Sequence, residues 1–334
     1  MQTSSSFADY FYFIFECLAI FFEIIINKIE ETLSDLIETP GNLIQDFLDS
    51  IANSLDESHP MGRPLQKLVF WFGGVISIVF VLISGLVKGI GSIFAGLLGG
   101  LLRIIGSILV LNFPQILIGG WDILSGTLSA IILTGGHVIM LVQTILLLQP
   151  HRRPLSEKEK RMLKKIFKSS LALYNIRVVE GWCGFFMYDN RPFNFGNMVF
   201  LKDRKVADEP DLLVHECTHT WQFQNVGARY LADAILVLTF MKNPYDWENE
   251  IKMGKDRWVL FNRESQAQFM EDIYMKGKIE GSGSKKIGLF YDADSKTKVG
   301  RFSVKRKNFT ELANDAVDTV RGRISTRLSR LFLD

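Results

Sequence analysis

An apolar block from Val69 to Pro150 constrains this chain more than any other feature. Its 82 residues hold only three formal charges, Lys88, Arg103 and Asp122, although 22% of the whole chain is charged. A helix rises 1.5 Å per residue, so about 20 apolar residues cross the ~30 Å hydrocarbon core of a bilayer. Three uncharged stretches have this length. They are residues 69–87, 104–121 and 123–149, and we expect two or three membrane crossings.

Glycines divide the same block. Gly85 and Gly89 are four residues apart, as are Gly96 and Gly100, and this spacing lets helices approach closely in lipid, within a chain or in an oligomer. The glycine-rich stretch 89–102 is short for a crossing, which favours a hairpin connection or a re-entrant piece. Gly135-Gly136-His137 is expected to interrupt the third crossing. The alternative is that residues 69–150 form buried helical hairpins of a large soluble protein.

The region before the block, residues 1–64, is typical of amphipathic helices. It opens on the aromatic run Tyr10 to Phe15, but Glu16 and Glu23 would be costly in mid-bilayer, which favours an interfacial or packed helix over a crossing. A basic stretch before the apolar run is missing, so no cleaved export signal is expected. Pro40-Gly41 predicts a break into two helices.

The composition changes at Pro150, where a basic run begins with His151-Arg152-Arg153. Basic residues after a membrane segment favour a multi-pass protein whose C-terminal half is cytoplasmic. The whole chain, with 38 Lys+Arg and 36 Asp+Glu, has too little net charge for a general nucleic-acid binder. Its three separated cysteines exclude a disulfide scaffold. We therefore divide the chain into residues 1–64, 65–150, 151–280 and 281–334.

The chemistry is expected in an H-E-x-x-H motif. His215 and His219 are four residues apart, so both imidazoles leave the same face of a helix and can share a metal ion. Glu216 stands where it can reach a water on that metal without binding the metal. Pro210 and Gly227 are suitable ends for this helix.

The third ligand is expected to be a carboxylate, because the other histidines lie in or beside the apolar block. Glu264 is the preferred candidate, on a helix predicted from Trp258 to Met275 in which the small Ala267 allows close packing. Glu248 and Glu250 are the rival candidates. Two imidazoles, a carboxylate and an open position favour Zn²⁺.

These motifs resemble a known group. The segment Gly196 to Leu201, followed by Leu212 to Gln222 with its H-E-x-T-H-x-W-Q pattern, is similar to bacterial zincin-like domains of the gluzincin type. Some of these domains occur with contractile injection systems and secreted effectors. The resemblance covers residues 177–276, and it departs from the gluzincin pattern where Arg263 separates Asn262 from Glu264. It implies an α+β zincin-like catalytic domain, mostly helical with a small edge-strand sheet, after an all-α N-terminal region that we expect to be transmembrane.

The expected activity is zinc-dependent peptide hydrolysis, with Glu216 as the general base. Asn197, Met198 and Val199 begin the strand expected at the sheet edge, where a peptide or protein substrate would pair. Tyr274 and Arg263 are candidates for stabilising the oxyanion. Two alternatives stay open: an exported effector or toxin protease whose apolar block inserts into a target membrane, and a catalytically silent zincin-fold binding module.

After the predicted site, Gly281 to Ser284 is expected to be a flexible link. Residues 287–291 and 300–304 are typical of a hairpin. The last segment, Phe309 to Leu333, is predicted to be a basic amphipathic helix. Such a helix packs on its own domain or lies on an anionic membrane.

Overall fold

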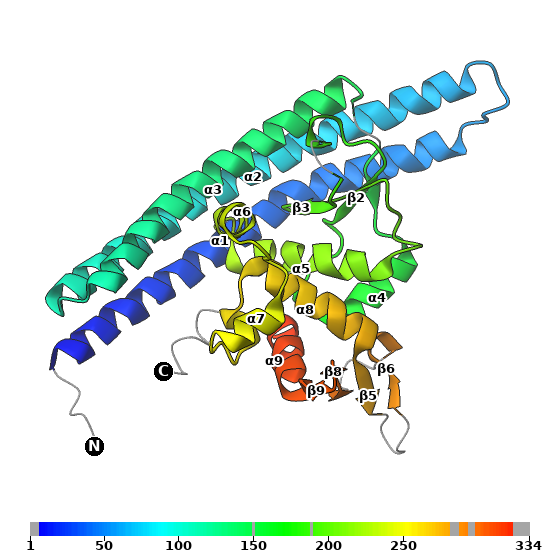
Figure 1. Ribbon diagram of the computed structural model, residues 1–334. Coiled ribbons are helices and arrows are strands. Elements are labelled where there is room, and N and C mark those ends of the chain that lie inside the picture. Colours follow the sequence, from blue (N-terminus) through cyan, green and yellow to red (C-terminus); the bar gives the residue numbers. More distant parts are fainter. Residues whose placement is uncertain (1–6, 149–150, 188–189, 281–286, 293–297, 323–334) are drawn as a thin grey trace.

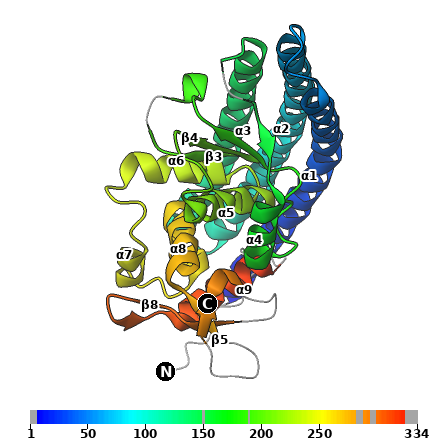
Figure 2. The ribbon, with the colours of Figure 1, turned by 90° about the vertical axis from the view of Figure 1, so that its right-hand side faces the viewer.

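The structure, a computed structural model, describes residues 7–148, 151–187, 190–280, 287–292 and 298–322. It is mostly helical with small sheets, as expected. Three long helices lie side by side, and an α+β part, formed by the described residues of 151–322, packs along one side of them (Figures 1 and 2). The helices are α1 (Phe7–Ser54), α2 (Gly62–Leu109), α3 (Phe113–Ile145), α4 (Glu157–Phe167), η1 (Gly184–Phe186), α5 (Pro210–Val226), α6 (Tyr230–Phe240), α7 (Trp247–Lys252), η2 (Trp258–Leu260), α8 (Arg263–Lys276), η3 (Phe290–Asp292) and α9 (Thr310–Arg321). The strands are β1 (Arg153–Pro154), β2 (Arg177–Glu180), β3 (Phe193–Phe195), β4 (Met198–Lys202), β5 (Lys278–Glu280), β6 (Ile287–Leu289), β7 (Val299–Arg301), β8 (Ser303–Val304) and β9 (Lys307–Asn308).

The three long helices form a layer with α2 in the middle. α2 packs along both α1 and α3, which make few contacts with each other. In the part of the chain that the structure describes, these three helices are long and apolar enough to cross a membrane. This supports the predicted association with a membrane. The sequence predicted a separate helical region at residues 1–64, but α1 packs along α2 as part of the layer.

The predicted break at Pro40-Gly41 is wrong, because α1 continues through both residues for 48 residues in all. A proline inside a helix removes one backbone hydrogen bond, but here the packing against α2 outweighs the loss. A side-chain carbon at Gly41 would lie 2.5 Å from Cβ of Phe80. The glycine therefore lets α1 approach α2 at the point where the sequence predicts a turn.

The predicted connection at residues 89–102 is also wrong, because this stretch lies within the continuous helix α2. The turn comes later, between Leu109 and Phe113, and cuts the candidate crossing 104–121 in two. Leu111 adopts a positive φ of 55° there, and Pro114 stands in the first turn of α3, where its missing amide proton costs nothing.

The glycines of the block are used for contacts within the chain. A side-chain carbon at Gly96 would lie 2.4 Å from the carbonyl oxygen of Asp122, and one at Gly100 would lie 2.4 Å from that of Gly119. Gly136 does not interrupt α3. It allows Phe195 of β3 to approach the helix, since an added side-chain carbon would lie 2.2 Å from the phenyl ring.

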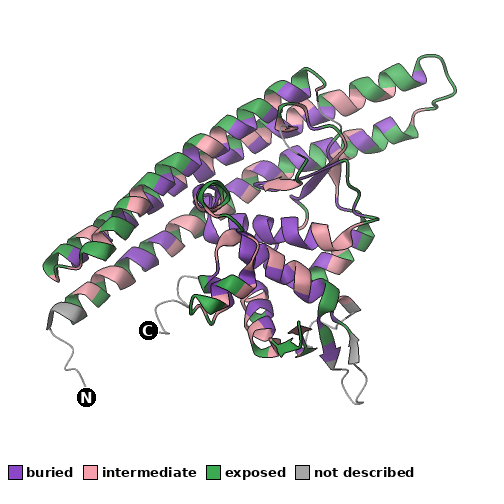
Figure 3. Ribbon diagram, viewed as in Figure 1, coloured by how far each residue is buried: buried purple, intermediate pink, exposed green. Residues whose placement is uncertain are grey.

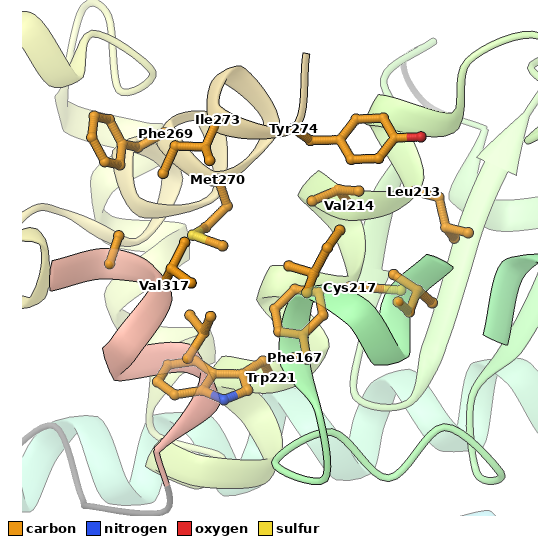
Figure 4. Close-up of a cluster of buried hydrophobic side chains, with 14 of the residues drawn as sticks. Phe167, Leu213, Val214, Cys217, Trp221, Phe269, Met270, Ile273, Tyr274 and Val317 are labelled. Carbon is orange, nitrogen blue, oxygen red and sulfur yellow. The ribbon is translucent and has the colours of Figure 1, made fainter. Parts of the chain in front are cut away.

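The α+β part is built on a four-stranded sheet of order β1-β2-β4-β3, in which β2 and β4 are parallel and the outer pairs antiparallel. Its main hydrophobic core lies between α4, α5, α8 and α9 (Figure 4). Leu213 and Cys217 of α5 and Met270 and Ile273 of α8 are buried in this core. His215, Glu216 and His219 of α5 are buried outside this core.

The C-terminal segments differ from the prediction in one respect. β6 and β7 do not pair with each other as a hairpin, because both pair with β5 in a sheet of order β6-β5-β7. The link at residues 281–284 lies outside the described residues, as does the end of the predicted last helix beyond residue 322. The described part, α9, packs on its own domain through Ala313, Ala316, Val317 and Val320, which are buried.

Candidate metal centre

The helix α5 carries the predicted motif at the predicted place. It begins with Pro210 and ends at Val226, before Gly227, whose φ of 87° stops the helix. His215 and His219 lie one turn apart, with ring centroids separated by 5.0 Å. The side chains of both are almost fully buried, with 8% exposed.

Helix α8 brings Glu264 to the two histidines. Asn262 caps this helix by accepting a hydrogen bond of 2.9 Å from the backbone N–H of Ser265, so the predicted helical stretch from Trp258 is divided into η2 and α8. Ala267 is fully buried where α5 and α8 pack together. Glu264 therefore sits in the first turn of α8, facing α5.

The three side chains converge. Glu264 Oε2 lies 3.7 Å from Nε2 of His215 and 3.4 Å from Nε2 of His219. Their candidate ligand atoms all lie within 4.8 Å of one another. In a tetrahedral zinc site with bonds of 2.0–2.1 Å, ligand atoms are about 3.4 Å apart, so this donor set fits zinc.

The Nδ1 atom of each histidine contacts another side chain, which orients the imidazole ring. His215 Nδ1 lies 2.9 Å from Oε2 of Glu271, and His219 Nδ1 lies 2.9 Å from Oε1 of Gln222. Such contacts fix the imidazole tautomer and leave Nε2 facing the metal position. Gln222 also donates to the carbonyl oxygen of Arg263 at 3.1 Å, which ties α5 to the start of α8.

The charges of the cluster favour a cation. Burial opposes a charge on His215, but hydrogen bonds to Glu264 and Glu271 prevail and raise its pKa to about 10. Burial also opposes the charge on Glu264, but the attraction of His219 and His215 lowers the pKa of this carboxyl below its usual range. Negative charge is thus concentrated around the imidazoles, as around a divalent metal ion.

Glu216 lies beside this cluster. Burial raises the pKa of its carboxyl above the usual value. Its Oε2 atom is buried and has no hydrogen-bond partner among the described residues. A buried acceptor of this kind is costly unless a ligand or a water fills the position.

The cluster faces a cavity of about 540 Å³. His215, Glu216, His219 and Glu264 form one part of its wall. The remaining wall comes from residues 191–195 around β3, from α6, and from single residues that include Ile132 of α3, Phe186 of η1 and Tyr245. This volume is in the range of small-molecule and peptide side-chain pockets.

The predicted substrate strand is wrong in its position. β4, which contains Met198 and Val199, is paired on both sides, so the edge strand beside the cavity is β3. Asn197 holds the sheet to other helices instead, because its amide donates to the Glu38 carboxylate and its oxygen accepts from Gln224 at 2.9 Å. Asn197, Met198 and Val199 do not line the cavity.

The two oxyanion candidates lie elsewhere. Tyr274 is in the core (Figure 4), where its hydroxyl donates to the sulfur of Met162 at 3.2 Å. Arg263 donates to Asp233 at 3.2 Å, and neither residue lines the cavity. Tyr230 and Tyr245 do line it, and the ring centroid of Tyr245 lies 6.0 Å from that of His215.

The rival carboxylates have other partners. Glu248 accepts a hydrogen bond of 2.7 Å from Lys305. Glu250 accepts from the backbone N–H and the side-chain amide of Asn262, each at 3.1 Å. Glu250 thus supports the cap of α8 and stands outside the cluster of possible ligands among the described residues.

Two positioning residues were missed in the sequence, although a signal existed for each. Glu271 follows Glu264 by seven residues, which places both on one face of α8 two turns apart. Gln222 follows His219 by three residues and so lies beside it on α5. Tyr245 of the cavity has no comparable signal in the sequence, because it lies in the loop between α6 and α7.

No protein-family model, curated protein or solved structure matches the chain. The similarity to zincins therefore depends on the motif alone, and what it implies about activity stays a prediction.

Proposed function

We propose that the protein is a membrane-associated, zinc-dependent metallopeptidase. One observation carries the proposal: His215, His219 and Glu264 converge on one point at a cavity, and Glu216 lies beside them with a buried oxygen that has no hydrogen-bond partner among the described residues. The proposal does not depend on the multi-pass arrangement or on the cytoplasmic side, which are predictions from the sequence alone. Under this proposal the α+β part is called the catalytic part.

In this proposal His215, His219 and Glu264 hold the zinc ion. Bound zinc would supply a Lewis acid that polarises a peptide carbonyl and lowers the pKa of an attacking water towards ~7. Glu216 accepts the proton of the water at its free carboxylate oxygen and transfers it to the leaving amine. Glu271 and Gln222 hold the imidazoles in the tautomer that keeps each Nε2 free.

The edge strand β3 is suited to binding an extended substrate. In the described part of the chain, β3 pairs only with β4, and its residues 193–195 line the cavity. The backbone groups on the open side of such a strand can pair with a peptide by strand addition. Tyr245, which lines the cavity, is the candidate for donating a hydrogen bond to the oxyanion, because the hydroxyl of Tyr230 already donates to Oδ1 of Asn194 at 2.9 Å.

The test uses full-length protein purified in detergent, with zinc content and cleavage of an unstructured protein measured on the same samples. Glu216→Gln should bind zinc as the wild type does and lose at least about 100-fold in cleavage rate, since it loses the general base. Glu248→Gln, which changes a carboxylate outside the cavity, should cleave normally. If Glu216→Gln cleaves at the wild-type rate, the proposed mechanism is wrong. Zinc binding without cleavage by any variant would favour the binding module.

A further inference from the structure

The layer of α1, α2 and α3 has two different faces. One face carries the catalytic part, whose polar contacts follow α1 from Glu23, which binds Arg229, to Asp49, which binds His151. These 26 residues of helix correspond to about 39 Å. The contact therefore extends along the layer and is not confined to its end (Figure 1).

The other side of the layer is open and apolar. Among the described residues, 40 exposed large apolar side chains lie on α1–α3 and 15 lie elsewhere. Exposed residues recur along the whole length of the helices (Figure 3). Ordinary soluble monomers do not expose apolar surface on this scale.

The charges of the helices point away from the open side. Lys88, Arg103 and Asp122, the charges of residues 69–145, are all buried. The ammonium group of Lys88 lies 4.3 Å from the ring centroid of Phe223 in α5, and Asp122 binds Arg229. Both contacts are with the catalytic part.

The length of the uncharged surface decides how a bilayer can cover it. From Val69 to Leu109, α2 exposes no charged residue over 41 residues, or about 60 Å. This is twice the ~30 Å of hydrocarbon in a bilayer. A crossing helix would leave half of this surface in water, and a bilayer covering residues 23–49 of α1 would also enclose the catalytic part.

We propose that the α1–α3 layer lies flat in one leaflet of a lipid bilayer, with its open face in the hydrocarbon and the catalytic part in water. The apolar face of helices in this orientation enters the headgroup and acyl-chain boundary to a depth of about 5–10 Å, and basic residues at the edges of the helices meet anionic headgroups. Where exposure is described, the exposed charged residues on α1–α3 are Lys28, Arg63 and Lys67. Arg63 pairs with Glu57 of the α1–α2 connection at 3.5 Å, which leaves Lys28 and Lys67 to meet the headgroups. These two lysines favour a bilayer with anionic phospholipids over a second copy of the chain, which would bring the same positive charges to the face.

This orientation has a consequence for the substrate, which rests on the proposed function. Helix α6 packs on α3 at the edge of the layer and walls the cavity. It carries exposed apolar side chains, with Leu236 42% and Phe240 79% exposed. The cavity then opens close to the membrane, and its substrates are polypeptides held at the membrane surface.

The orientation is tested by measuring depth in the bilayer along α2. Phe72→Cys, Ile90→Cys and Ile108→Cys change side chains that are 52%, 55% and 53% exposed. Each is made singly in full-length Cys17→Ser protein and labelled with a small fluorophore. The protein is reconstituted in vesicles of equal parts phosphatidylcholine and phosphatidylglycerol, with nitroxide lipids that quench at shallow or deep positions. Met253→Cys, in the catalytic part and 55% exposed, is the matched control.

A flat layer gives the same shallow-to-deep quenching ratio at all three positions of α2 and no quenching at the control. Positions 72 and 108 are about 54 Å apart along the helix. A crossing helix cannot keep both in ~30 Å of hydrocarbon, so loss of quenching at either end overturns the proposal. Absence of quenching at all three positions overturns it as well.

The substrate class has its own test on the same vesicles. An unstructured protein carrying a lipid anchor should be cleaved about tenfold faster or more than the same protein without the anchor, because tethering raises its effective concentration at the cavity. Equal rates would overturn the substrate class. Failure to cleave either form would count against the proposed peptidase, and the depth measurements would still decide the orientation.

Discussion

The contact between Glu271 and His215 gives a quantitative test of the candidate metal centre. Oε2 of Glu271 lies 2.9 Å from Nδ1 of His215, and the two side chains are 19% and 8% exposed. A carboxylate in this position holds the imidazole ring so that Nε2 faces the metal. Glu271→Ala removes both the charge and the hydrogen-bond acceptor, whereas Glu271→Gln removes only the charge.

The two substitutions should differ in size. Residues that orient a metal-binding histidine typically change metal affinity by 10- to 100-fold when they are replaced. A hydrogen bond to a charged group contributes about 1.5–3 kcal/mol and a neutral one about 0.5–1.5 kcal/mol. The partial exposure of Glu271 favours the low end of each range. We expect zinc binding to weaken by about 10- to 30-fold in Glu271→Ala and by about three- to fivefold in Glu271→Gln.

The assay is competition for zinc between detergent-purified protein and a chelating fluorophore. Glu248→Gln is the control, because the Glu248 side chain is similarly exposed, at 22%, and is bound to Lys305 away from the cavity. Wild-type affinity in Glu271→Ala would refute the proposed role of this residue. Equal weakening in the control would show that the effect comes from general destabilisation.

Three further predictions concern the support of the site. Gly136→Ala should displace β3 and lower the cleavage rate, because the added side-chain carbon would meet Phe195. Gly135→Ala, whose added carbon would meet open space, should keep activity and stabilise α3 by about 0.5–1 kcal/mol. Both variants are compared with the wild type by cleavage rate and by unfolding midpoint. Zinc at 100 times its dissociation constant should stabilise the protein by about 2.7 kcal/mol; the unfolding midpoint should fall with a chelator in the wild type and stay unchanged in Glu264→Ala. Asn262→Ala should cost about 1 kcal/mol in denaturant unfolding by removing the cap of α8, and Asn262→Asp, which retains a capping oxygen, should cost much less.

The sequence was sufficient to predict the local part of the site. The spacing of His215 and His219 places both on one face of a helix wherever that helix packs. Glu264 was preferred over Glu248 and Glu250 because it lies on a predicted second helix in which the small Ala267 allows close packing, and the fold brings it to the histidines. The order of the strands could not be predicted from the sequence. Whether β4 lies inside the sheet depends on its pairing with β3 and β2, which no local pattern specifies.

The helix ends in the apolar region were mispredicted for a related reason. Proline and glycine are breakers when the local chain decides, but Gly41 and Gly96 are positions of close helix contact, where the same lack of a side chain favours packing. Sequence patterns alone do not separate these two uses of glycine. The distinction needs the partner helix.

The charges of the apolar block show how closely the two parts of the chain depend on each other. Asp122, one of the three charges of the apolar block, binds both Arg103 of α2 and Arg229, which comes directly before α6. Glu23 of α1 joins the same two arginines at 2.9 Å each. Removing one member of such a buried cluster leaves its partners charged without compensation, which costs about 3–5 kcal/mol. The cluster therefore ties the cavity wall formed by α6 to all three long helices, so the geometry of the cavity depends on them.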